Sequence, residues 1–221
     1  MTALIFDCDG VLVDSEVLAH VIEMEALAAA GLHYSPDEFR ERFMGTSDQT
    51  FYDALEADAL KRLGRSIRDD VFPQMKSRYV AALRERLTEV PGALAMVSAL
   101  PHAKAVASSS SMVTLELKLR KTGLWDHFAP HVYSAQHVTH SKPAPDLFLL
   151  AAKALRVPEE DCLVLEDSVN GVTAALAAGM RVWAFCGGGH MDAASTQRLL
   201  AAGAERSVAS WAEAAELFQS I

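Results

Sequence analysis

The sequence has few cysteines, fewer basic than acidic residues, and no long uninterrupted hydrophobic run. Its three cysteines, Cys8, Cys162 and Cys186, are too few and too scattered for a disulfide framework or a zinc site. The 20 basic against 29 acidic residues give a formal net charge of -9, which argues against a nucleic-acid partner. No apolar stretch is long enough to span a bilayer, and no signal peptide is evident at the N-terminus. We therefore expect a reduced, soluble, cytoplasmic protein with neither a nucleic-acid nor a membrane partner.

The pattern of apolar runs predicts the fold class. The 221 residues are 51% hydrophobic, which suits one domain or one core with a modest insertion. An apolar run over residues 3–6 stops at Asp7 and is typical of a strand buried on both faces of a parallel sheet. Further strands are expected at 103–107, 131–133, 162–165 and 181–185, and helices at 92–100, 115–124, 146–155 and 172–178. This alternation predicts an α/β fold, a Rossmann-like parallel sheet with helices on both faces.

A stretch without strand-like runs interrupts this pattern after the first strand. Apolar residues at helical spacing follow Ser15, and Ser35 precedes a proline and an acidic turn as a helix N-cap does. Further helices are expected over residues 48–63 and 67–87. The sequence therefore predicts a core formed by residues 1–14 and 88–221, with a helical cap domain inserted over residues 15–87.

Polar and charged residues follow the predicted strands at the point where each one ends. Asp7 and Asp9 follow the first strand, the serine run 108–111 follows the second, and Lys142 follows the third. Glu166 and Asp167 are adjacent after the fourth. Because ligands of open parallel sheets bind beyond the carboxyl ends of the strands, we expect these groups to converge.

Carboxylates crowd together only with a cation, and Mg2+ prefers such hard oxygen ligands. A lysine and a serine at a helix N-terminus add groups that bind anions. Such a set of residues suits phosphoryl transfer.

The spacing of Asp7 and Asp9 sharpens this prediction. Residues i and i+2 of an extended segment point the same way, so both carboxylates are expected to face one site. One of them can attack phosphorus to form an aspartyl-phosphate, while the other protonates the leaving oxygen and later deprotonates water. Cys8, between them, is expected to face the opposite side and to pack in the core.

Four motifs then resemble those of a known family. The stretch DCDGVLVDSE over residues 7–16 closely resembles the first motif of the haloacid dehalogenase-like (HAD) phosphatases. Ser108, Lys142 with Pro143, and the Glu-Asp-Ser of residues 166–168 match the second, third and fourth motifs in order. The cap resembles that of the branch that includes beta-phosphoglucomutases and phosphoglycolate phosphatases, and within it bacterial sugar-phosphate phosphatases. The resemblance covers nearly the whole chain.

Carried over residue by residue, the resemblance implies roles for the matched positions. Asp7 would be the nucleophile, and Asp9 the general acid and base. Ser108 and Lys142 would hold the transferring phosphoryl group, to which Ser109 would offer its backbone N–H.

The resemblance also implies a Mg2+ cofactor. Its ligands would be Asp7, the main-chain carbonyl of Asp9, and Asp167. Glu166 would be a nearby or a direct ligand of the metal.

The cap is expected to choose the substrate. Its closure would exclude bulk water and orient the leaving group. Gly45, at a break between two cap helices, and Glu16, just past the first hinge, are the candidate substrate contacts.

Three other classes of protein share some of these features. Beta-phosphoglucomutases carry a basic cap residue shortly after the equivalent of Gly45, where this chain reads Thr-Ser-Asp over residues 46–48. They also carry a histidine where this chain has Ala19, with His20 one place off and on a different face. A response-regulator receiver lacks both the adjacent Asp-x-Asp and the cap. A noncatalytic phosphate-binding regulatory protein is the third alternative, although all the catalytic side chains are present.

These features favour a Mg2+-dependent phosphomonoester hydrolase. The substrate is expected to be a small phosphorylated metabolite, such as a sugar phosphate or a related acid. We expect the protein to be a monomer, the default for a chain with few exposed apolar stripes.

Overall fold

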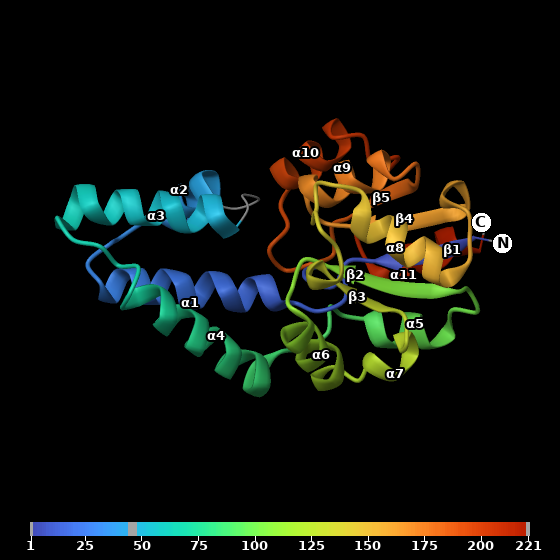
Figure 1. Ribbon diagram of the computed structural model, residues 1–221, viewed down its shortest axis with the longest axis horizontal. Helices are drawn as coiled ribbons and strands as arrows, with labels where there is room; N and C mark the ends of the chain where they lie inside the picture. Colours follow the sequence, from blue (N-terminus) through green and yellow to red (C-terminus); the bar gives the residue numbers. More distant parts are fainter. Residues whose placement is uncertain (1, 44–47, 220–221) are drawn as a thin grey trace. The chain divides into compact units, whose positions relative to one another are not determined.

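The computed structural model describes residues 2–43 and 48–219 (Figure 1). The chain divides into two compact units, one formed by Met1–Glu16 with Arg86–Ile221 and the other by Val17–Glu85. Among the helices that the structure describes, none is long and apolar enough to cross a membrane.

The larger unit, which we call the core unit, contains a parallel sheet, as the sequence predicts. In the described residues the strand order is β3-β2-β1-β4-β5-β6. The strands are β1 (Ala3–Phe6), β2 (Lys104–Ser108), β3 (Val132–Ser134), β4 (Cys162–Glu166), β5 (Arg181–Phe185) and β6 (Ser207–Val208). Strand β1 pairs in parallel with both β2 and β4, and all four of its residues are buried. Burial on both faces explains why it is a continuous apolar run without alternation.

Helices cover both faces of this sheet (Figure 1). They are α5 (Ala93–Ala99), α6 (Met112–Lys121), α7 (Trp125–Phe128), α8 (Asp146–Leu155), α9 (Val169–Ala177), α10 (Ala193–Ala201) and α11 (Trp211–Phe218). Ile5 of β1 belongs to the cluster that also holds buried residues of α8, α9 and α10. Phe6, the next residue, packs against Phe128 of α7 and Trp211 of α11 on the other face.

Serine caps move two helix starts upstream of the predicted positions. Helix α6 begins at Met112 rather than at 115, because the Ser111 side chain accepts a hydrogen bond from the backbone N–H of Thr114. Helix α9 begins at Val169 rather than at 172, because Ser168 caps it in the same way. The C-terminal elements β6, α10 and α11, and the one-turn helix α7, have no counterpart in the sequence prediction.

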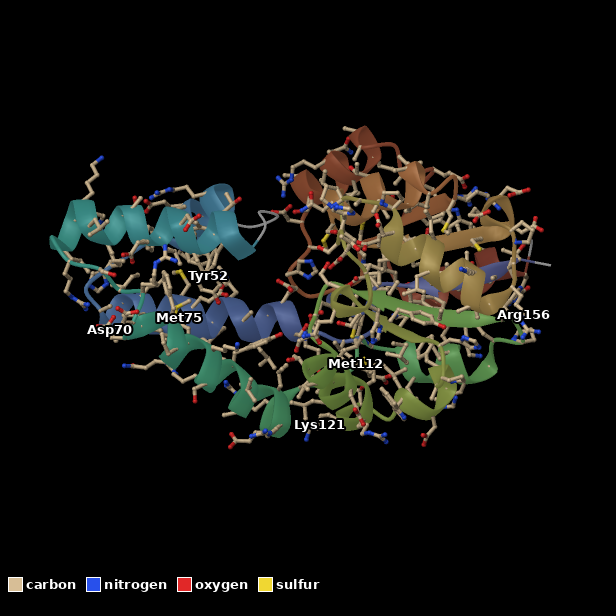
Figure 2. The ribbon with its side chains drawn as sticks, in the orientation of Figure 1. Tyr52, Asp70, Met75, Met112, Lys121 and Arg156 are labelled. Atoms are coloured by element: carbon tan, nitrogen blue, oxygen red, sulfur yellow. The ribbon has the colours of Figure 1, made fainter. Side chains whose placement is uncertain are left out.

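The smaller unit is all-helical in its described residues. It comprises most of α1 (Ser15–Ala29), with α2 (Pro36–Phe43), α3 (Asp48–Leu63) and α4 (Val71–Arg86). Ser35 caps α2 as predicted, accepting a hydrogen bond from the Glu38 N–H at 3.1 Å. Helix α4 starts at Val71 and not at 67, because residues 68–70 form a turn before it. Met75 of α4, labelled in Figure 2, is buried in the apolar core of this unit.

The C-terminal helix α11 supports the loop that follows β1. The indole of Trp211 is 1% exposed, and its ring centroid lies 5.6 Å from that of Phe6 and 5.0 Å from that of Phe185. Its Nε1–H donates to the backbone carbonyl of Val11 at 3.0 Å. The C-terminal helix thus holds the loop that carries Asp7 and Asp9.

We predict that Trp211→Ala lowers the free energy of unfolding by about 3–5 kcal/mol, because it leaves a cavity beside β1. Urea unfolding followed by circular dichroism measures the change. Val113→Ala is the control, because Val113 is 81% exposed, and it should change stability by about 0.5 kcal/mol or less. A loss below about 1 kcal/mol in Trp211→Ala would show that this helix does not support the sheet.

Candidate active site

The structure brings the residues at the strand ends to one edge of the sheet. Asp7 follows β1 directly, and its N–H donates to the carbonyl of Leu165 in β4 at 3.0 Å. Ser108 is the last residue of β2 and Glu166 the last of β4. Because these strands are parallel and in register, their carboxyl ends place the three side chains together.

Lys142 links two buried carboxylates. Its Nζ donates to Asp7 Oδ1 at 2.6 Å, to Glu166 Oε1, and to the carbonyl of Ala107 at 2.9 Å. The side chain is 3% exposed, and its Nζ lies 4.8 Å from the centre of the Phe148 ring. Burial alone would lower the pKa of Lys142, but the charges of Asp7 and Glu166 raise it above its usual value. Lys142 is therefore a fixed cation beside Asp7.

Glu166 is fully buried, and protein donors occupy both of its oxygens. Oε1 accepts from Lys142, while Oε2 accepts from the N–H groups of Asp167 and Ser168, each at 3.1 Å, and from the Ser168 hydroxyl at 2.9 Å. A Cβ on Gly171 would lie 1.9 Å from the Glu166 carboxyl group, so only glycine leaves room for it. This arrangement favours an orienting role for Glu166 over the direct-ligand alternative.

Asp9 is held by a second buried lysine, Lys118. Its Oδ1 accepts from Lys118 Nζ and from the Ser15 hydroxyl. Its Oδ2 accepts from the Ser110 hydroxyl at 2.9 Å and, more distantly, from the Ser108 hydroxyl at 3.4 Å. Burial alone would raise the pKa of Asp9, but Lys118 and the hydroxyl donors lower it below its usual value.

Among the predicted metal ligands, Asp7 and Asp167 are the side-chain carboxylates left for a cation, because donors within residues 2–43 and 48–219 occupy both oxygens of Glu166 and of Asp9. Burial raises the pKa of Asp7 well above its usual value, Lys142 opposes this, and the charges of Glu166 and Asp167 add to it. Burial also raises the pKa of Asp167, against a hydrogen bond from His190.

The oxygen donors in this part of the site suit a hard cation. A Cβ on Gly10 would lie 1.9 Å from Asp167 Oδ2, so the backbone after Asp9 passes directly beside that carboxylate. Within residues 2–43 and 48–219, His, Cys, Asp and Glu side chains do not form a metal-holding group of three. Two carboxylates with a main-chain carbonyl form an all-oxygen set, which fits Mg2+ rather than a softer metal.

Three further residues are predicted for the site, namely Ser109, Glu16 and Gly45. Ser109 is exposed between Ser108 and Ser110. Glu16 is half-buried in the first turn of α1, and burial with the charges of Asp9 and Asp167 raises its pKa to about 7. Gly45 lies outside the described residues.

Three residues of the site, Lys118, Ser15 and His190, are not predicted from the sequence. Lys118 had a readable signal, because Leu115 and Leu119 place it on the buried face of α6 at helical spacing. His190 Nε2 lies 3.1 Å from Asp167 Oδ2, and its Nδ1 has no hydrogen-bond partner in the part of the chain that the structure describes. Its signal was its place after the fifth strand, at the same edge of the sheet.

The chain matches the haloacid dehalogenase-like hydrolase family over residues 1–179, and it belongs to that family. It is 29% identical to the 6-phosphogluconate phosphatase of Escherichia coli strain K12 over 188 residues, covering 85% of this chain and 84% of the relative. It is 33% identical to the fructose-1-phosphate phosphatase YqaB of the same strain, covering 80% and 92%.

A solved structure agrees over the full length. This is a conserved haloacid dehalogenase-like protein of unknown function from Agrobacterium tumefaciens, 33% identical, with a TM-score of 0.89 and coverage of 100% of this chain and 98% of that chain. The family and the two named phosphatases show that this chain is a phosphatase enzyme. They confirm the resemblance and the class of enzyme that the motifs predict.

We predict that Gly171→Ala lowers phosphatase activity by on the order of a hundredfold, because the new methyl group displaces Glu166 and with it Lys142. Alanine suits the helical backbone at this position, so circular dichroism should still show a folded protein. Thr173→Ala, at an exposed position on the same helix, is the matched control and should keep wild-type activity. Full activity in Gly171→Ala would mean that the position of Glu166 does not matter.

Proposed function

We propose that this enzyme hydrolyses the phosphomonoester of a small sugar or sugar acid through an aspartyl-phosphate on Asp7. The observation that carries the proposal is the separation of two neighbouring carboxylates by two buried lysines. Lys142 holds Asp7 and Lys118 holds Asp9, so the two groups have different surroundings although they are two residues apart. Because each aspartate meets its own lysine, the two groups can take different roles, nucleophile and proton carrier. A cation held by Asp7 would oppose the rise in its pKa that burial causes and favour its nucleophilic, ionised form.

In the first step, an oxygen of Asp7 forms a bond to phosphorus while the bond from phosphorus to the ester oxygen breaks. The negative charge of the bound phosphoester would raise the pKa of Asp9 against the effect of Lys118, so that Asp9 enters this step protonated. Asp9 then donates its proton to the departing alkoxide, which leaves as an alcohol. Lys142 provides a fixed positive charge that complements the phosphoryl oxygens. Ser108 and the backbone N–H of Ser109 lie at the N-terminal side of α6, where an anion is favoured.

In the second step, a water molecule attacks the phosphorus of the aspartyl-phosphate. Asp9, now ionised, removes a proton from this water as the new bond between oxygen and phosphorus forms. The bond between phosphorus and Asp7 breaks, and inorganic phosphate leaves with the Asp7 carboxylate restored. Each turnover therefore regenerates both aspartates in their starting states.

Asp7, Asp167 and the main-chain carbonyl of Asp9 would hold Mg2+. A bound Mg2+ neutralises negative charge on the phosphoryl group during transfer. His190 donates to Asp167 and would orient its carboxylate. Glu166 would act through Lys142.

The proposed substrate class rests on the relatives and on the cap. Both named relatives are phosphatases of phosphorylated sugars or sugar acids. His20, the nearest match to the mutase histidine, has its ring centroid 5.0 Å from that of Phe39 in the apolar cluster of the smaller unit. The chain has Ala19 at the position of the mutase histidine, and this supports hydrolysis over a mutase reaction.

We expect the protein to release phosphate repeatedly from a sugar phosphate, tested with a panel that includes 6-phosphogluconate, fructose 1-phosphate and p-nitrophenyl phosphate. Phosphate release should vanish in EDTA and return with Mg2+. Asp7→Asn should abolish turnover, because the amide is not a nucleophile that forms the intermediate. Asp126→Asn, at an exposed aspartate, is the control and should match the wild type.

Turnover by Asp7→Asn close to that of the wild type would refute the assignment of the nucleophile. No release from any ester by the folded protein with Mg2+ would refute the hydrolase proposal. Isomerisation of a sugar 1-phosphate would then be the next assay.

A further inference from the structure

Lys118 is a buried charge on the apolar side of a helix. It lies between Leu115 and Leu119 on the buried face of α6, and its side chain is 3% exposed. Its Nζ forms an ion pair with Asp9 Oδ1 and donates to the Ser110 hydroxyl at 2.9 Å. Burying a lysine is costly, and a buried ion pair stabilises a fold little better than an apolar side chain of similar size. The contacts of Lys118 therefore indicate a role in the reaction rather than in stability.

The hydrogen bonds to Asp9 are divided unequally between its two oxygens. Oδ1 accepts from Lys118 and from Ser15, which are both almost fully buried. Among the residues that the structure describes, the donors to Oδ2 are the hydroxyl groups of Ser110 and Ser108. A hydroxyl group can turn to another acceptor, whereas the ion pair at Oδ1 is tied to the helix.

We propose that Lys118 is a positioning residue that anchors Oδ1 of Asp9 and thereby presents Oδ2 as the oxygen that exchanges protons with the substrate. Through its hydrogen bond to Ser110, Lys118 also holds the oxygen of the hydroxyl that faces Oδ2, while the proton of that hydroxyl stays able to turn to another acceptor. This inference rests on the proposed function, in which Asp9 gives a proton to the leaving oxygen. The inference adds that Lys118 determines which oxygen of Asp9 gives this proton.

The leaving group separates this role from a merely structural one. A sugar alkoxide needs a proton as it departs, whereas p-nitrophenolate is stable without one. We expect Lys118→Met to lower kcat/KM by about 100-fold for the best sugar phosphate of the panel, and to leave kcat/KM for p-nitrophenyl phosphate nearly unchanged. The ratio kcat/KM is the right measure, because it excludes the later hydrolysis of the aspartyl-phosphate. Lys121→Met, at the exposed lysine labelled in Figure 2, is the control on the same helix and should match the wild type with both esters.

A double variant covers the case in which Lys118→Met leaves Asp9 unpaired and unfolds the protein. Asp9→Asn with Lys118→Met removes both charges, so no buried charge is left without a partner. If Lys118 acts through Asp9, the double variant should hydrolyse the sugar phosphate as fast as Asp9→Asn alone.

An equal loss with both esters, or a further large loss in the double variant, would overturn the positioning role. The wild-type assay separates this failure from failure of the proposed function. If the wild type hydrolyses both esters and Asp7→Asn hydrolyses neither, the phosphatase mechanism stands whatever Lys118 does.

Discussion

The bridge from Lys142 to Asp7 and Glu166 is the interaction on which the rest of the site depends. Asp7 sits at the end of the central strand with 7% of its surface exposed, where an unpaired carboxylate would be costly. Lys142 provides the opposite charge, and Glu166 keeps that lysine in place through a carboxylate saturated with donors. Gly171 leaves the space that Glu166 needs. The charge pairing, the space at Gly171 and the parallel register of the strands therefore all serve to hold Lys142 beside Asp7.

A second buried lysine, Lys118, provides the opposite charge for Asp9. The segment after β1 places Asp7 and Asp9 two residues apart, and each meets a lysine from a different part of the chain. Lys142 follows β3, whereas Lys118 comes from the buried face of α6. The fold thus keeps two adjacent carboxylates chemically distinct, which is the condition for one to attack phosphorus while the other carries a proton.

The fold and the site residues at the strand ends could be predicted because short, local sequence patterns reveal them. Strands buried on both faces are short apolar runs, and Asp7, Ser108 and Glu166 are recognisable because they end such runs. The apolar spacing of α6 indicates that Lys118 lies on the buried face, but it does not show that Lys118 meets Asp9 there. The contact of His190 with Asp167 likewise depends on the three-dimensional path of a loop. Short elements such as α7 and β6 were missed because they have too few residues to show a period. Serine caps shifted two helix starts by a turn, which apolar periodicity alone does not show.

The most direct test of the account is to look for phosphate on Asp7 itself. The enzyme would be mixed with its best sugar phosphate and Mg2+, quenched in acid within a single turnover, digested, and analysed by mass spectrometry. We predict that the peptide containing residues 7–16 gains one phosphoryl group, which disappears as turnover completes and never forms in Asp7→Asn. A phosphoryl group on another residue, or rapid turnover without any phosphorylated peptide, would contradict it.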